Sequence, residues 1–303
     1  MAITLVGAAC DLGVSKDGAS KGAEAIINDL SNDINKIIIK QDQNFVKSTD
    51  KNDKAKNLDE VNKFNKYMYE KELELKNNDS FVISVGGDHV MGIPPVLSSV
   101  KKYGEIGLIW VDAHPDFNTF ETTITGNLHG LPCAAVAGYH CDKLTEFHDG
   151  NYVNPKNIVI VGARSIDEGE MVNLKDAGVT IISAEEVRKM GVKNVMDKAY
   201  KIALQNTGKL HISFDLDVID PNDAPGVTVP EKDGILEDEA YEIINYITDR
   251  YNVLTSLDVV EYNPVYDLGG KTKKIAVNLV NNAIEKRLKY ERDNEKHIKW
   301  NNN

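Results

Sequence analysis

The sequence is short of cysteine and of long apolar runs. Its 303 residues contain three cysteines, Cys10, Cys133 and Cys141, which form no CxxC pair and are odd in number. This usage disfavours a disulfide scaffold and fits a reducing compartment. No apolar run approaches the roughly 20 residues that span a bilayer. The apolar stretch 3–10 is too short for a signal-peptide core, so we expect a cytoplasmic protein without a membrane anchor.

Positive charge is also in deficit. The chain has 35 Lys and Arg against 47 Asp and Glu, which gives a net charge of −12. So acidic a chain offers little of the basic surface that nucleic acids and anionic membranes require, and we expect neither partner. The same charge suits a small cationic molecule. With 42% hydrophobic residues, the chain is long enough to bury a sizeable core.

Short β-branched runs recur along the chain and predict strands covered on both faces. The runs lie at residues 3–8, 35–40, 81–85, 106–111, 157–162, 179–183, 210–214 and 253–257. Each run is apolar at both odd and even positions, which is typical of a parallel sheet. Helix-type patterns lie between them, at 58–75, 194–206 and 236–251. The alternation predicts an α/β fold with a sheet of about eight strands.

Nothing in the sequence divides the chain into separate units. It has no internal repeat and no low-complexity linker, so we expect one domain over residues 1–303. Segment 41–58 is polar and carries charges of both signs, and we expect an exposed loop there. The charged closing segment 286–303 is expected to form a surface helix that frays at its end.

Acidic and imidazole side chains follow four of the predicted strands. They are His89 after the third run, Asp112, His114 and Asp116 after the fourth, Asp215 and Asp217 after the seventh, and Asp258 and Glu261 after the eighth. Ligands of open parallel sheets bind at the carboxyl ends of the strands, so these side chains are expected at one edge. Residues two apart on a strand point the same way, which pairs Asp112 with His114 and Asp215 with Asp217.

So many carboxylates in one cleft repel each other and are costly to desolvate unless cations are present. Taken singly, each residue has a structural alternative: His89 as a capping or core histidine, and Glu261 in a surface ion pair. Their co-occurrence favours metal ligation by His89, Asp112, His114, Asp116, Asp215 and Asp217. This set is rich in oxygen and lacks thiolate, which favours Mn²⁺ over a thiolate zinc site and leaves Mg²⁺, Fe²⁺ and Co²⁺ open. Six ligands exceed the need of one ion and predict a two-metal site.

Several sequence blocks resemble the ureohydrolase family and, within it, the arginases. The blocks are GAACDLGVSKDGASKGAEAI, SVGGDHV, VDAHPDFNT, TGNLHGLP, SFDLDVIDPNDAPGVTVP and DVVEYNP, in chain order. The resemblance covers nearly the whole chain. It implies a three-layer α/β/α fold with a mainly parallel sheet, two Mn²⁺ ions per subunit, and a homo-oligomer, as a trimer or a hexamer.

The resemblance also implies roles for individual residues. One ion would be bound by His89, Asp112, Asp116 and Asp215, and the other by Asp112, His114, Asp215 and Asp217. The implied reaction is hydrolysis of L-arginine to L-ornithine and urea by a hydroxide that bridges the two ions. In the family pattern Asp116 and His129 handle protons, Glu261 pairs with the substrate guanidinium, and Thr228 lies beside that contact.

The amino-acid end of the substrate has its own implied contacts. Asn118 and Thr125 would hold the α-carboxylate, and Asn127 belongs to the same block. Asp167 would meet the α-amino group, with Glu170 close behind it, whereas Ser165 stands where the family has an acid. The TGNLHGLP block favours arginine. Agmatine or guanidinobutyrate as the substrate, or a catalytically silent metal-binding paralogue, remain the alternatives.

Overall fold

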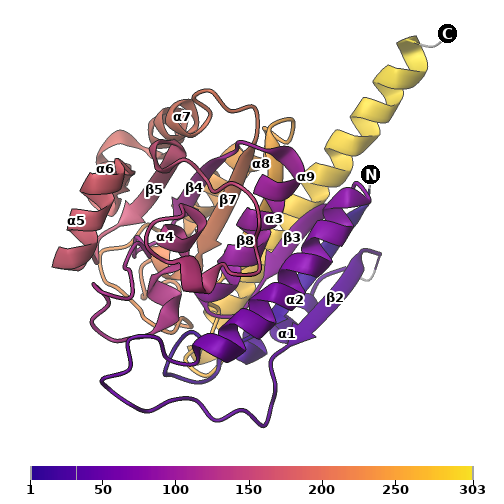
Figure 1. The fold of residues 1–303 in the computed structure, drawn as a ribbon. Helices are drawn as coiled ribbons and strands as arrows, with labels where there is room; N and C mark the ends of the chain where they lie inside the picture. The colour runs from indigo at the N-terminus through magenta and orange to yellow at the C-terminus, as the bar shows by residue number, and fades with distance from the viewer. Residues whose placement is uncertain (1, 32, 302–303) are drawn as a thin grey trace.

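The computed structural model describes residues 2–31 and 33–301, with the side chains of the last helix described up to Asn294. At its centre lies an eight-stranded sheet, in the order β2-β1-β3-β8-β7-β4-β5-β6, in which each strand pairs parallel to its neighbours (Figure 1). The strands are β1 (Ile3–Ala9), β2 (Asn35–Lys40), β3 (Phe81–Val85), β4 (Gly107–Val111), β5 (Ile158–Ala163), β6 (Thr180–Ser183), β7 (Leu210–Asp215) and β8 (Leu254–Val260). All eight predicted strands are confirmed, with ends that differ by at most three residues.

Helices cover both faces of this sheet. One layer holds α2 (Leu58–Asn77), α3 (Ile93–Tyr103), α4 (Pro132–Val136) and α5 (Glu168–Ala177). The other holds α1 (Gly22–Ile27), α6 (Ala184–Met190), α7 (Val192–Ala203), α8 (Glu237–Thr248) and α9 (Lys271–Asn301). This is the three-layer α/β/α arrangement expected from the sequence, and the helices predicted at 58–75, 194–206 and 236–251 correspond to α2, α7 and α8.

The two cores follow from the alternation of side chains along each strand. On β4, Leu108 and Trp110 are buried beneath α3 and α4, whereas Ile109 and Val111 are buried on the opposite face. Since successive residues of a strand point to opposite faces, a run that is apolar at every position fits a strand between two helix layers.

The C-terminal helix is longer than expected. It begins at Lys271 rather than at the charged segment 286–303, because its first turns bury Ile275, Leu279 and Ala283 against the sheet. The fraying expected at the end concerns residues 302–303, which lie outside the described residues. Among the described residues, no helix has both the length and the apolar character needed to cross a membrane.

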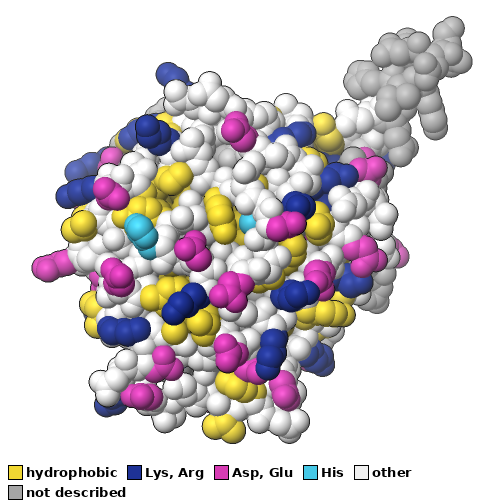
Figure 2. All heavy atoms as spheres, viewed as in Figure 1, with side chains coloured by type: hydrophobic (Ala, Val, Ile, Leu, Met, Phe, Trp, Pro, Cys, Tyr) yellow, Lys and Arg dark blue, Asp and Glu magenta, His cyan; other side chains and the backbone are white. Residues whose placement is uncertain are grey.

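The segment 41–57 connects β2 to α2 without forming a helix or strand of its own. It lies at the end of the sheet where the strands terminate (Figure 1). The Lys56 amide donates to Gly126 O at 3.2 Å, and the Lys54 ammonium donates to Thr123 O. These bonds hold the segment against residues 123–126. On the face drawn in Figure 2, basic and acidic side chains are interspersed.

The order of the strands creates a crevice at their carboxyl ends. β3 and β4 follow each other in the chain but are separated in the sheet by β8 and β7. The chain connections on the β3 side of the sheet therefore run in the opposite direction from those on the β4 side. Ligand sites of open α/β sheets lie where the direction of the connections reverses in this way. The ends of β3, β8, β7 and β4 carry the acidic and imidazole side chains of the candidate site.

Candidate active site

Each predicted metal ligand lies at or just beyond the end of a strand. His89 starts a short 3-10 helix after β3, and the Asp88 carboxylate caps this turn by accepting the Val90 amide at 2.9 Å. Asp112 directly follows β4, whereas Asp215 is the last residue of β7. The loop after β4 turns sharply, because Asp116 has a φ of 51°. Such a left-handed conformation in a residue other than glycine costs free energy and is frequent at functional sites.

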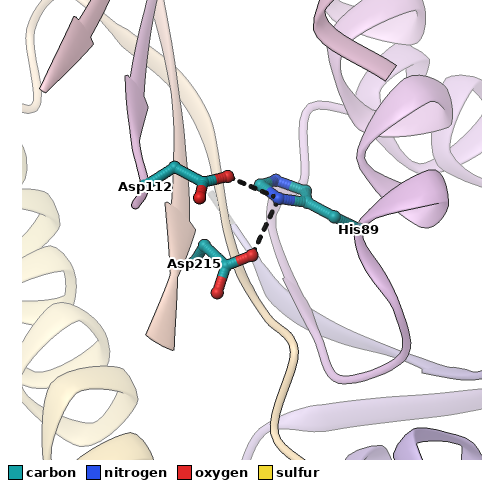
Figure 3. Close-up of side chains that lie close together, drawn as sticks. All are labelled: His89, Asp112 and Asp215. Carbon is teal, nitrogen blue, oxygen red and sulfur yellow. Dashed lines mark ion pairs between the residues drawn. The ribbon is translucent and has the colours of Figure 1, made fainter. Parts of the chain in front are cut away.

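Three carboxylates surround one nitrogen of His89. Its Nδ1 lies 3.0 Å from Asp112 Oδ2, 3.0 Å from Asp215 Oδ2 and 3.1 Å from Asp116 Oδ2. Figure 3 shows Asp112 and Asp215 reaching toward this nitrogen from the ends of their neighbouring strands. His89, Asp112 and Asp215 are buried and close enough together to hold a metal ion between them.

A second group shares Asp112 with the first. His114 Nδ1 lies 2.9 Å from Asp217 Oδ2 and 3.6 Å from Asp112 Oδ1, so the two oxygens of Asp112 face different histidines. Asp112, His114 and Asp217 also meet the spacing of a metal site. Backbone amides orient the carboxylates, since Ala113 N donates to Asp217 Oδ1 at 3.2 Å and Asp217 N donates to Asp215 Oδ1 at 2.7 Å.

The hydrogen bonds of His89 show that a cation fits this centre. The Ser213 hydroxyl donates to Asp258 Oδ1, so its oxygen accepts from His89 Nε2, which lies 2.8 Å away. A neutral imidazole with its proton on Nε2 presents a lone pair at Nδ1. That nitrogen is buried and has no hydrogen-bond partner among the described residues. A lone pair facing three carboxylate oxygens requires a positive charge between them, which a divalent metal ion would supply.

The pKa shifts of the metal-free side chains also indicate that a cation fits this centre. Burial, followed by the negative charge of Asp112, raises the pKa of Asp116 to about 7. Burial and the neighbouring Asp217 and Asp112 raise the pKa of Asp215 well above its usual range. Burial alone would lower the pKa of His89, but the three carboxylates outweigh it and raise this pKa. Without metal, the cluster therefore retains protons to offset its negative charge.

Glu261 and His129 form a pair beside the metal groups. Glu261 directly follows β8 and has a φ of 66°, which turns its side chain back toward His89. Its Oε1 accepts the His89 amide at 2.8 Å and lies 3.1 Å from His129 Nδ1. Burial would raise the pKa of Glu261, but the bond to His129 outweighs it and lowers the pKa. Its Oε2 is buried and without a hydrogen-bond partner in the described part of the chain, so it remains available to a ligand.

These side chains line a cavity of about 220 Å³ that opens to solvent. The cavity wall includes His89, His114, Asp116, Asn118, Thr125, Asn127, His129, Asp167, Glu170, Asp215, Asp217 and Glu261. All of these were predicted from the sequence to bind metal or substrate or to act in catalysis. Asp112 lies just beneath the cavity and is fully buried.

The polar rim of the cavity is cross-linked by hydrogen bonds. Asn118 Nδ2 donates to Asp167 Oδ2 at 3.1 Å, and Asn127 Oδ1 accepts the Ser15 hydroxyl at 2.7 Å. Thr125 is solvent-exposed, and its hydroxyl accepts the Asn127 amide at 3.2 Å. Buried Glu170 accepts the Phe117 amide at 2.7 Å and the Asp167 amide at 3.3 Å, so it ties the rim to α5.

The structure places two residues, Thr228 and Asp258, differently from what the sequence pattern indicated. Thr228 is buried, and its hydroxyl accepts from Asn263 Nδ2 at 3.3 Å, whereas the next residue, Val229, lines the cavity. Asp258 is not at the strand edge, because β8 continues to Val260 and buries this carboxylate against His211.

Sequence reasoning did not identify Ser213, Val229 and Glu231 as parts of this region. Ser213 precedes Asp215 by two residues on β7, so strand periodicity could have placed it on the same face. The position of Glu231 depends on how the loop after β7 folds, for which the sequence carries no periodic signal.

The arginase family model matches residues 1–285 of the chain. The arginase of Bacillus subtilis strain 168 is 34% identical over an alignment that covers 94% of this chain and 98% of that protein. The chain belongs to the arginase family. The structure of Bacillus caldovelox arginase has a TM-score of 0.86 at 30% identity, and covers 93% of this chain and 97% of its own. Entamoeba histolytica arginase in complex with L-ornithine has a TM-score of 0.85 at 28% identity, with coverages of 94% and 99%.

Membership of the arginase family agrees with the chemistry of the site. The cavity floor holds two histidine–carboxylate groups with a common aspartate, and its wall adds a buried glutamate oxygen that has no partner among the described residues. The fold and the family predicted from the sequence are thereby confirmed.

Proposed function

We propose that the protein hydrolyses L-arginine to L-ornithine and urea at a centre of two Mn²⁺ ions. The observation that carries this proposal is the surroundings of His89 Nδ1, a buried nitrogen that faces three carboxylate oxygens at 3.0–3.1 Å. The side chains that would hold the ions are His89, Asp112, His114, Asp116, Asp215 and Asp217. Two divalent ions, when bound, would offset the carboxylate charge and supply a water that loses its proton near neutral pH.

Glu261 would bind the cationic end of the substrate. A guanidinium is planar and carries several N–H donors, and a carboxylate accepts from it with favourable geometry. Glu261 Oε1 already accepts from the His89 amide and lies beside His129, so Oε2 is the oxygen left for the substrate. Burial strengthens this ion pair, because water does not screen it.

His129 would deliver a proton to the departing amine. Burial would lower its pKa, but the contact with Glu261 outweighs it and raises the pKa, which favours the protonated imidazole. Asp116 lies on the same wall of the cavity and can take up a proton from the attacking water. At the rim, Asn118 and Thr125 would bind the α-carboxylate, and Asp167 the α-ammonium group.

The proposal extends to manganese as the metal, to a cytoplasmic location, and to a trimer or hexamer of identical chains. The oxygen-rich ligand set supports manganese. Three buried free cysteines are compatible with a reducing compartment. The oligomer rests on the family resemblance alone, and size-exclusion chromatography with light scattering tests it.

One assay tests the function. The purified protein, loaded with Mn²⁺ and freed of excess metal, is given arginine, agmatine or guanidinobutyrate, and urea is measured. We expect equal amounts of urea and ornithine from arginine, and no urea after treatment with a chelator. Faster urea release from agmatine or guanidinobutyrate would assign a different ureohydrolase activity. No urea from any of the three, with metal bound, would indicate a silent paralogue.

A further inference from the structure

Glu231 places a carboxylate beside His114, on the side away from the candidate metal groups. It lies on the loop between β7 and α8 and lines the cavity with its side chain 36% exposed. Its Oε1 lies 3.7 Å from His114 Nε2 and 3.4 Å from the Ser165 hydroxyl, which donates to it. Neither the predicted metal ligands nor the predicted substrate contacts include this residue.

The backbone of this loop is anchored to the metal-binding turn by Arg164. The Arg164 guanidinium donates to Asp217 O at 2.8 Å, to Glu231 O at 2.8 Å and to Lys232 O at 2.8 Å. An isolated bridge between Ile219 and Ile235 ties the two ends of the loop together. The distance from Glu231 to the Asp217 turn is therefore set by a rigid, planar cation rather than by a free loop.

The two nitrogens of His114 face opposite partners. Nδ1 faces Asp217 and Asp112, where the second ion would bind, and Nε2 faces Glu231. A histidine that ligates through one nitrogen needs its proton on the other, and a carboxylate at that second nitrogen fixes the tautomer and orients the ring. We propose that Glu231 is a positioning residue that holds His114 with its Nδ1 lone pair directed at one of the two metal ions.

The other histidine of the centre is held differently. His89 Nε2 is bonded to Ser213 in the buried interior, whereas His114 is partly exposed and receives its partner from a loop. The two histidine ligands are thus oriented by different residues, Ser213 for His89 and Glu231 for His114. A change at Glu231 should therefore affect only the ion bound by His114.

The experiment measures metal binding, because the inference rests on the proposed two-metal centre. Mn²⁺ affinity of the full chain is determined by competition with a chromophoric chelator, which resolves two binding events if two ions bind. In Glu231→Gln we expect one of them to weaken by roughly 10–100-fold and the other to stay unchanged. Thermal unfolding of the metal-free variant checks the fold, since a partly exposed isosteric change should leave the unfolding temperature nearly unchanged.

Two further variants separate positioning from general charge or packing. Asp233→Asn removes the same charge from the same loop at an exposed position and should leave both affinities unchanged. Ser165→Asp, added to Glu231→Gln, returns a carboxylate next to the place that Glu231 occupied and should restore the weakened binding event.

Unchanged affinities in Glu231→Gln, equal weakening of both ions, the same loss in Asp233→Asn, or no recovery with Ser165→Asp would each overturn the proposal. If the unmodified protein does not bind two ions, the proposed two-metal function itself is contradicted. The titration of the unmodified protein shows this before any variant is compared.

Discussion

His211 Nε2 lies 2.7 Å from Asp258 Oδ2, and both side chains are fully buried beneath the candidate metal centre. The other oxygen of Asp258 accepts from Ser213, whose hydroxyl oxygen in turn accepts from His89. The pair therefore belongs to a buried chain of hydrogen bonds, continued by His211 Nδ1 to Ser256, that directs the lone pair of His89 Nδ1 toward three carboxylates. A carboxylate that accepts from two donors in the protein interior is an anchor for both.

Replacing Asp258 should weaken both the fold and the metal centre. Asp258→Asn offers one acceptor instead of two, so either Ser213 or His211 is left facing an amide N–H. We expect a loss of roughly 1–3 kcal/mol in the free energy of unfolding of the metal-free protein, measured by urea titration. Affinity for the ion bound by His89 should fall by about 10–100-fold. Asp149→Asn, at a side chain that is 84% exposed, is the control, and equal effects of the two changes would contradict the anchoring role.

Asp112 should matter for both ions and His114 for one. Asp112 presents one oxygen to each histidine, at 3.0 and 3.6 Å, whereas His114 reaches only the second group. We expect Asp112→Ala, and likewise Asp215→Ala, to abolish urea release and to lower the metal content toward zero. His114→Ala should retain about one ion per chain. Metal analysis after dialysis measures this, and full occupancy in Asp112→Ala would rule out a shared ligand.

The rim residues should decide between arginine and agmatine. Agmatine lacks the α-carboxylate, so a rim built for that group leaves donors unpaired when agmatine binds. We expect Thr125→Val to lower kcat/KM for arginine by roughly 5–150-fold, which corresponds to about 1–3 kcal/mol for a lost bond to a charged group, with metal content unchanged. Asp167→Asn should act in the same direction.

The control for the rim is Thr49→Val, at an exposed threonine outside the cavity wall. Rates for agmatine, measured in parallel, should change far less than rates for arginine. An unchanged arginine rate in both Thr125→Val and Asp167→Asn would show that these two residues do not bind the amino-acid end of the substrate. The metal ligands would still support a ureohydrolase activity.

Glu170 should make the metal-free protein less stable as pH rises. Burial is the main cause that raises its pKa from 4.5 to about 8. The folded state therefore holds a proton that the unfolded state has lost between pH 4.5 and 8, and unfolding releases it, so stability falls across this window. Glu170→Gln should reduce the slope of unfolding free energy against pH by up to about 1.4 kcal/mol per pH unit.

Urea titrations of the metal-free protein at several values between pH 5 and 8 measure this slope. Glu168→Gln, at an exposed position on the same helix, should leave the slope unchanged. A Glu170→Gln curve that runs parallel to that of the unmodified protein would show that the buried carboxylate does not titrate in this window.

The sequence by itself determined the eight strands and the residues at their ends. A strand buried on both faces must be apolar at every position, and a helix that covers it must repeat with its own period, so both leave a local signal. The polar residues that interrupt these runs, such as His89, Asp112 and Asp215, were visible for the same reason. Their number and type also indicated that metal ions balance their charge.

The tertiary structure decided which of these residues meet and which face one another. The order of β3, β8, β7 and β4 brings His89, Glu261, Asp215 and Asp112 to one crevice, although up to 172 positions separate them in the chain. Asp258 looked like a residue at the edge, but the added length of β8 pairs it with His211 in the interior. Val229 rather than Thr228 lines the cavity, and Glu231 reaches His114, because Arg164 and the Ile219–Ile235 bridge fix a loop whose sequence has no periodicity. Contacts of this kind depend on long-range packing, which a local pattern of residues does not encode.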